Sequence, residues 1–276
     1  MGQLHRPWLQ LRYDIQELAL LPIDAYNDTA ARGRTFLLYH DGLMNVRTRS
    51  IRSDWKAAFQ KLMHWPVGAD IDRVDSKDVV LVLRDGASLT TDHFSAQHLD
   101  DLLRASLVFA VSALDRYVHE RVIKGIVGSL KQSPLTKPQQ ELMIPVTTAI
   151  TISEEVRMAR KAGTTIRTAN IIRKKVQELL HKRPFQSFRE IEYAFNLLGV
   201  TNISGQLQIL YGKRDITAEK AQLNRIVSRR NAIVHEGDLL KHERGGKVRM
   251  QPIARKYVED SLNFIGAFVG HLEHVS

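Results

Sequence analysis

The sequence predicts a mainly helical protein, with a helical bundle and a smaller mixed α/β region at the N-terminus. From residue 95 onward, apolar residues recur at steps of three and four, which is the spacing of one buried helix face. The best strand candidate, residues 78–84, precedes that stretch and ends at an Asp-Gly turn. The chain is 43% hydrophobic and 25% charged, which is typical of a globular protein. We therefore expect two parts, residues 1–94 and residues 95–276.

The N-terminal part is expected to hold one helix before the strand, over residues 52–65, and Pro66 stops it. The first residues of the chain carry charges and lack a long apolar core, so they do not resemble a secretory signal. The most apolar stretch, residues 105–114, is too short to span a bilayer. These features predict a soluble cytoplasmic protein with no membrane partner.

The bundle is expected to begin with one helix of about eight turns. Ser95 is its predicted N-cap, and the helix should end near Gly125 or Gly128. Residues 131–152 contain three prolines and are interpreted as a long connection or an insertion.

Three further main helices complete the predicted bundle. They cover about residues 165–182, residues 215–234 and a last helix from Pro252. A short helix opened by a capping box at Ser187 and closed by Gly199 lies between them. The residues expected on the buried side of the last helix are Ile253, Tyr257, Phe264, Phe268 and Leu272.

Arg230 is the strongest physical anomaly in the sequence. On a helix, it lies at the centre of an apolar direction. The apolar residues that point within about 60° of that direction are Leu223, Ile226, Val227, Ile233 and Val234. Burying an unpaired guanidinium is costly, so Arg230 should face a partner, a cleft or a subunit interface.

His235 follows Arg230 by five positions, or about 140° around an uninterrupted helix. The two side chains therefore would not meet on one straight helix. Either the helix unwinds near residues 236–238, or a working site combines these groups from two copies. Asn231 precedes His235 by one turn and could fix the orientation of its ring.

The segment Arg229-Arg230-Asn231-Ala-Ile-Val-His235-Glu-Gly-Asp238 resembles the motif of HEPN-domain ribonucleases, and especially their RiboL-PSP type. A second phrase, Ser112-Ala-Leu-Asp115-Arg-Tyr-Val-His119, is similar to the first long helix of that type. The resemblance covers about residues 95–275 and implies an up-and-down HEPN-like helical bundle there.

The Arg-to-His spacing alone carries no weight, because about three such pairs are expected by chance in this composition. The competing pair is Arg34–His40, which lacks the adjacent Asn and is treated as a decoy. The pair ending at His235 gains weight from Asn231, from its helix position and from the matching first helix.

The resemblance implies a metal-independent endoribonuclease that acts as a homodimer without a cofactor. Attack of a ribose 2′-hydroxyl on the adjacent phosphorus would leave a 2′,3′-cyclic phosphate. His235 can transfer protons near neutral pH, and Arg230 can donate to phosphate oxygens. The implied biology is a toxin or abortive-infection (antiviral) effector that cuts cellular RNA, held in check by an antitoxin or defence-system partner. Residues 1–94 would then contact that partner, a trigger or the RNA.

Further residues are expected to support the site or to bind RNA. The supporting set is Arg229, Asp115, His119, Ser112 and Asp238. Residues such as Ser112, Asp115 and His119 more often form a hydrogen-bonded core or interface set than act as catalysts. The predicted RNA-binding residues are Arg173, Lys174, Lys175, Lys182 and Arg183. Charge runs are often only solvated faces, but the formal net charge of +10 favours a polyanionic partner.

Other chemistries find less support. The chain has no cysteine, which excludes thiolate zinc sites and cysteine nucleophiles, and it lacks a Gly-rich phosphate loop and a His-Glu-x-x-His pair. Two alternatives to an enzyme remain. One is a non-catalytic HEPN-type binding or adaptor module. The other is a basic nucleic-acid-binding protein that binds RNA in a salt-sensitive way without turnover.

Overall fold

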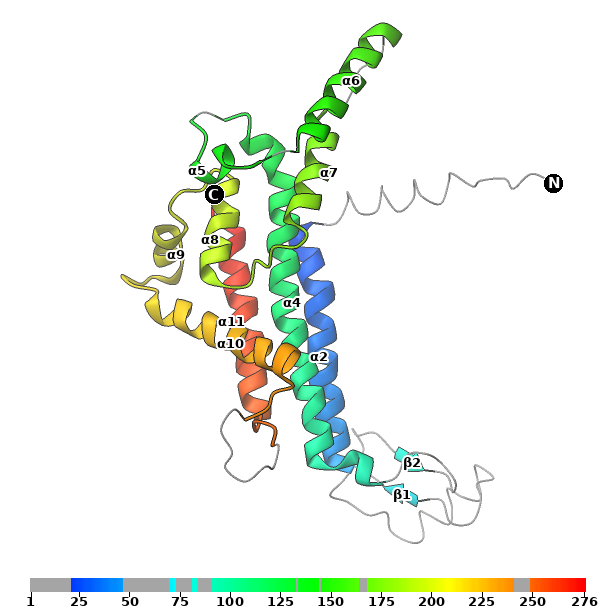
Figure 1. Cartoon of the computed structure of the whole chain (residues 1–276). Coiled ribbons are helices and arrows are strands. Elements are labelled where there is room, and N and C mark those ends of the chain that lie inside the picture. The colour runs from blue at the N-terminus through cyan, green and yellow to red at the C-terminus, as the bar shows by residue number, and fades with distance from the viewer. Residues whose placement is uncertain are drawn as a thin grey trace, which may run out of the picture. The chain divides into compact units, whose positions relative to one another are not determined.

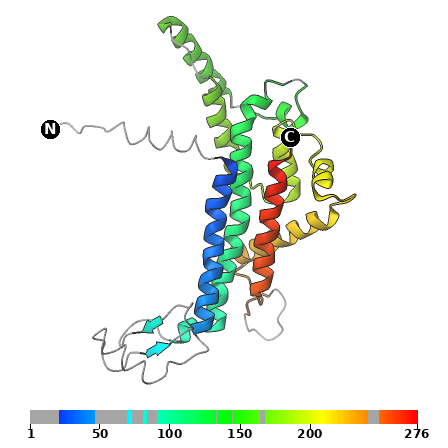
Figure 2. The same ribbon diagram turned by 180° about the vertical axis from the view of Figure 1, so that it is seen from behind.

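The computed structural model describes residues 21–46, 70–72, 81–83, 91–132, 134–143, 145–163, 168–240 and 249–276. Within these ranges the protein is mainly helical, as predicted (Figures 1 and 2). The chain forms two compact units. Unit 1 contains residues 1–29, 111–228 and 264–276, and unit 2 contains residues 30–110 and 229–263. No helix in the described ranges is long and apolar enough to cross a membrane.

The predicted long helices are all present. The first is α4 (Ala96–Ser129), and the basic helix is α7 (Thr168–Leu180). The last two are α10 (Thr217–Glu236) and α11 (Arg255–Glu273). The Ser95 hydroxyl accepts from the backbone N–H of His98 at 3.4 Å, which confirms the predicted N-cap of α4.

Unit 1 has a core of large side chains contributed by several helices. Besides parts of α4, α10 and α11, it contains α5 (Lys137–Gln140), α6 (Val146–Ala162), α7, α8 (Phe188–Leu197) and α9 (Ile203–Tyr211). Its largest fully buried side chains are Tyr117, Phe185, Phe195 and Phe268. Ser187 caps α8 by accepting from the backbone N–H of Glu190 at 3.4 Å. The carboxylate of Glu190 binds Arg183 at 2.6 Å, so only half of the predicted capping box forms.

Two helices, α5 and α6, occupy much of the stretch that the sequence analysis interpreted as a long connection. Two of the three prolines there begin helices instead of interrupting them. Pro138 lies in the first turn of α5, and Pro145 is the N-cap of α6. Proline suits these positions because the first N–H groups of a helix have no intrahelical acceptor. Thr136 and Gln139 add a complete capping box to α5.

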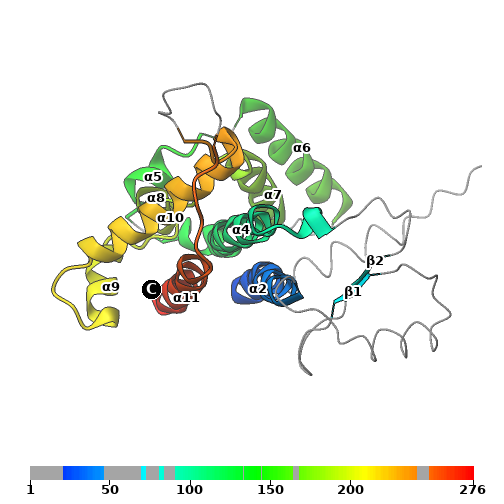
Figure 3. The ribbon, with the colours of Figure 1, turned by 90° about the horizontal axis from the view of Figure 1, so that it is seen from below.

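Unit 2 contains only parts of α2 (Pro22–Val46), α4 and α11, and these parts lie side by side, as Figures 1 and 3 show. The Ser106 hydroxyl on α4 donates to the Gly33 carbonyl on α2 at 2.7 Å. A Cβ at Gly33 would lie 3.1 Å from the Ser106 carbonyl oxygen, so glycine permits this close crossing. Arg255 on α11 binds Asp41 on α2 at 2.9 Å.

The description of residues 1–94 as mixed α/β is not supported. Two short strands, β1 (Asp70–Asp72) and β2 (Leu81–Leu83), form an antiparallel pair, but the main described element is the 25-residue helix α2. The sequence analysis missed α2 because its buried positions are largely small or polar, among them Ala25, Ala30 and Gly33. The helix predicted over residues 52–65 lies outside the described residues. The domain division after residue 94 stays a prediction.

One side-chain expectation for α11 was wrong. Tyr257 is exposed, whereas its neighbour Val258 is completely buried. In unit 2 the buried face of α11 runs through Val258 and Leu262. At the start of the helix, the buried position is therefore one residue later than the predicted one, Tyr257. Ile253, Phe268 and Leu272 are buried as predicted.

Candidate functional site

The end of α10 has a defined geometry. The helix continues through His235 to Glu236, so it does not unwind before the histidine. Gly237 and Asp238 then adopt φ values of 63° and 58°, both left-handed. The Asp238 N–H donates to the carbonyl of Ala232 at 2.9 Å, six residues back, and this bond closes the end of the helix. A left-handed conformation costs an L-residue about 1–2 kcal/mol in general, and aspartate is among the few residues other than glycine that adopt it.

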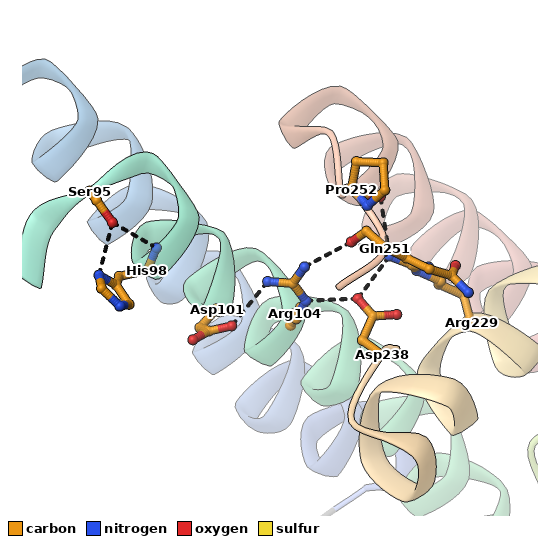
Figure 4. Close-up of polar contacts among 8 residues, drawn as sticks. All are labelled: Ser95, His98, Asp101, Arg104, Arg229, Asp238, Gln251 and Pro252. Carbon is orange, nitrogen blue, oxygen red and sulfur yellow. Dashed lines mark hydrogen bonds and ion pairs between the residues drawn. The ribbon is translucent and has the colours of Figure 1, made fainter. Parts of the chain in front are cut away.

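Asp238 is held by two arginines (Figure 4). Its side chain is fully buried, and Oδ2 accepts from Arg104 Nε at 2.7 Å and from Arg229 Nη2 at 2.8 Å. Both arginines also donate to the carbonyl of Gln251, at 2.8 Å and 3.2 Å. This Asp238 cluster therefore joins α4, the end of α10 and the segment that leads into α11, all within unit 2.

The charges of the Asp238 cluster are balanced. Arg104 Nη1 also donates to Asp101 at 3.0 Å, so two guanidinium groups meet two carboxylates. Arg104 and Arg229 are only 6% and 14% exposed. Removing one partner of such a buried pair typically costs about 3–5 kcal/mol, because the remaining charge stays buried without compensation.

Arg230 has very different surroundings from its neighbour Arg229. Arg230 as a whole is half-buried, and its Nη1 donates to Asn231 Oδ1 at 3.0 Å. Its Nε is buried without a hydrogen-bond partner. In the described part of the chain no carboxylate pairs with Arg230, so Arg229 is the arginine that receives a buried partner. Arg230 keeps donors available for an anion.

His235 is exposed on the last turn of α10. Asn231 is exposed as well, but its side-chain oxygen accepts from Arg230. Among the described residues, no hydrogen bond joins Asn231 to His235. The predicted orienting role of Asn231 therefore stays a prediction, and its observed contact orients Arg230.

A family model described as RiboL-PSP-HEPN matches residues 80–274 of the chain. The chain belongs to this family. The RiboL-PSP-HEPN match includes every helix from α4 to α11 and therefore the whole Asp238 cluster, Arg230 and His235. No curated protein and no solved structure gave a significant match.

The first long helix of the RiboL-PSP-HEPN domain carries Ser112, Asp115 and His119 in unit 1. Asp115 Oδ1 accepts from the backbone N–H of Phe185 at 2.6 Å. The His119 ring lies 4.6 Å from the Phe185 ring, and its Nε2 is 3.9 Å from Asp115. This geometry gives Asp115 and His119 a structural role in holding the segment after α7. Their supporting role in catalysis stays a prediction.

The basic residues of α7 and its flank differ in availability. Lys175 binds Glu178 at 2.7 Å, and Arg183 both binds Glu190 and stacks over the Tyr193 ring at 3.6 Å. Arg173 is half-buried. Lys174 and Lys182 are exposed, and neither forms an ion pair within the described ranges. These two lysines are the best placed of the five for phosphate contacts.

Arg104 is the site residue that the sequence analysis missed. It immediately precedes the most apolar stretch of the RiboL-PSP-HEPN domain, residues 105–114, which contains no other cation. A lone arginine in such surroundings was the available signal. Its partner Asp238 is 134 positions away, so the pairing itself could not be read from the sequence.

A pocket of about 360 Å³ opens beside the Asp238 cluster in unit 2. Its walls are mostly apolar and include Phe109, Ile233 and Met250, with Arg104 and Asp238 also among the lining residues. In the described part of the chain, no group of three or more histidine or acidic side chains could hold a metal ion.

Proposed function

We propose that this protein is a metal-independent endoribonuclease whose catalytic residues are Arg230 and His235. The observation that carries the proposal is that the two neighbouring arginines at the end of α10 have different partners. Arg229 is used in the buried Asp238 cluster, whereas within the described residues Arg230 has only a neutral amide as its partner. Membership of the RiboL-PSP-HEPN family supports the same site.

The side chains match the needs of RNA cleavage by a 2′-hydroxyl. The hydroxyl loses a proton as its oxygen bonds to phosphorus, and the 5′-oxygen gains a proton as its bond breaks. His235 is exposed at the end of α10, and its imidazole is the group that would accept and donate these protons. The guanidinium of Arg230 can stabilise the charge on the phosphorane oxygens. The expected products carry a 2′,3′-cyclic phosphate and a 5′-hydroxyl.

The working unit that we propose is a homodimer. Because α10 continues to Glu236, Arg230 and His235 point about 140° apart on a single helix. Two copies that face each other at this end would bring both residue types to one phosphate. By family resemblance, the enzyme would act in the cytoplasm as a toxin or antiviral effector, restrained by a partner protein.

The deciding test is cleavage of total RNA and tRNA in excess EDTA. We expect the wild type to cut and to leave cyclic-phosphate ends, and we expect Arg230→Ala and His235→Ala to abolish cutting. Arg225→Ala is the matched arginine control, since Arg225 is exposed on the same helix. His274→Ala is the histidine control, because His274 is exposed near the C-terminus. Cutting that survives Arg230→Ala and His235→Ala would refute the site.

The alternative is a binding module without turnover. It is favoured by the same 140° separation, because a single chain does not bring the two groups together. A protein that binds RNA but cuts none, with or without added metal ions, would support this alternative. A protein that neither binds nor cuts RNA would support an adaptor for other proteins.

A further inference from the structure

We propose that Arg104 is a positioning residue, which acts through Asp238 to hold the end of α10 in its working orientation. The inference rests on the proposed function, because it assigns a purpose to the orientation of Arg230 and His235. Arg104 itself lies on α4, outside the Arg-Asn-x-x-x-His motif.

All three nitrogens of the Arg104 guanidinium are engaged. Nε donates to Asp238, Nη1 to Asp101 and Nη2 to the Gln251 carbonyl. A planar guanidinium that is almost fully buried and donates from all three nitrogens is held in one orientation. Figure 4 shows it between α4, the turn after α10 and the segment before α11. Arg104 is thus a fixed group, and the end of α10 is bound to it through Asp238.

The attachment reaches the proposed catalytic residues through a short stretch of backbone. Asp238 lies three residues after His235 and is left-handed, a conformation that few residues other than glycine adopt. Its N–H closes the last turn on Ala232, so the carboxylate and the backbone of the same residue both anchor the helix end. Helix ends fray when such anchors are removed. Releasing Asp238 would therefore loosen the turn that carries His235.

The geometry of the carboxylate favours positioning over stability as the purpose. Both arginines bind Oδ2, and among the described residues none donates a hydrogen bond to the buried Oδ1. The two arginines therefore fix the place of the carboxylate through Oδ2.

The test compares Arg104→Met, Arg104→Lys, Asp238→Asn and the double variant Arg104→Met/Asp238→Asn. Two readouts are the kcat and KM for RNA cleavage and the amide hydrogen exchange of residues 232–239. We expect kcat to fall about tenfold to a hundredfold with KM nearly unchanged, because a small misplacement of reacting groups has that effect. The double variant should lose no more than the worse single variant, since the two residues act through one contact. Arg104→Lys should not restore kcat, because an ammonium group lacks the planar, forked set of donors of a guanidinium.

The control is Arg255→Met, which breaks another arginine–carboxylate contact of unit 2, between Arg255 and Asp41. It should lower the melting temperature while leaving kcat unchanged below that temperature. A fall in kcat like that of Arg104→Met at equal loss of stability would overturn the inference. A folded Arg104→Met variant with the kcat and the amide hydrogen exchange of the wild type would also overturn the inference.

A wild type without cleavage would refute the proposed function, and exchange would then decide on Arg104 by itself. Faster exchange confined to residues 232–239 would support positioning of the helix end. Unchanged or uniformly faster exchange would overturn it.

Discussion

Arg229 and Arg230 show how one position on a helix changes the chemistry of a side chain. They differ by about 100° in direction. The left-handed turn after α10 brings the Asp238 carboxylate back toward the helix. Arg229 binds this carboxylate, and Arg230 does not. The same guanidinium is therefore a structural cation at one position and a candidate phosphate ligand at the next.

Asp115 allows a stability prediction at the residue scale. Its carboxylate accepts the backbone N–H of Phe185, whose side chain is completely buried. Asp115→Ala should lower the free energy of unfolding by about 1–3 kcal/mol, because that N–H is left without its acceptor. Asp115→Asn keeps an acceptor and should cost less, and Arg116→Ala is the exposed control on the same helix. Urea denaturation measures all three, and equal losses for the Ala and Asn variants would contradict the assignment.

Asp41 allows a pH prediction. Burial raises the pKa of Asp41, but hydrogen bonds from Arg255 and His40 outweigh it and hold the pKa below its ordinary value of 3.8. Because the folded pKa is the lower one, the carboxylate stabilises the fold above the unfolded pKa and ceases to do so as pH falls through the folded pKa. The stability advantage of wild type over Asp41→Asn should therefore be constant from pH 7 to about 5 and shrink below about pH 4. Urea denaturation over this range measures it, and an advantage that persists unchanged to pH 3 would contradict the linkage.

At the scale of single elements, α7 provides the test of RNA binding. Lys174 on α7 and Lys182 just after it are the exposed candidates, whereas Lys175 and Arg183 have acidic partners. Replacing Lys174 or Lys182 by Gln should weaken RNA binding and reduce the slope of log affinity against log salt by about 0.7 for each phosphate that the protein no longer neutralises. Lys131→Gln is the exposed control. Fluorescence anisotropy in a His235→Ala background, which prevents cleavage, measures the slope, and an unchanged slope would remove α7 from the RNA surface.

At the scale of the whole molecule, the proposed homodimer makes a complementation prediction. If a working site takes its arginine from one copy and its histidine from the other, then mixed dimers of Arg230→Ala and His235→Ala chains keep one intact pair. Mixing the two inactive variants should therefore restore part of the cleavage activity, whereas neither variant alone should cut. Co-refolded mixtures assayed with RNA measure this, after light scattering has established the dimer. Mixtures that stay inactive although mixed dimers form would refute a site shared in this way.

The sequence by itself determined the helices whose signals are local. Steps of three and four identified α4, α7, α10 and α11, and Ser95 and Ser187 marked two helix starts. The motif around Arg230 and His235 pointed to the family that the RiboL-PSP-HEPN match confirms. These signals depend on neighbouring residues only, because periodicity and capping act within a few turns.

Only the tertiary structure decided which charges are buried together and which face of a helix is buried. The pairing of Arg104 with Asp238 joins residues 134 positions apart, and α2 packs through small residues that leave no clear apolar period. The choice of Arg229 over Arg230 depends on a left-handed turn after α10. Burial of a charge depends on every segment that surrounds it, so no local pattern specifies it.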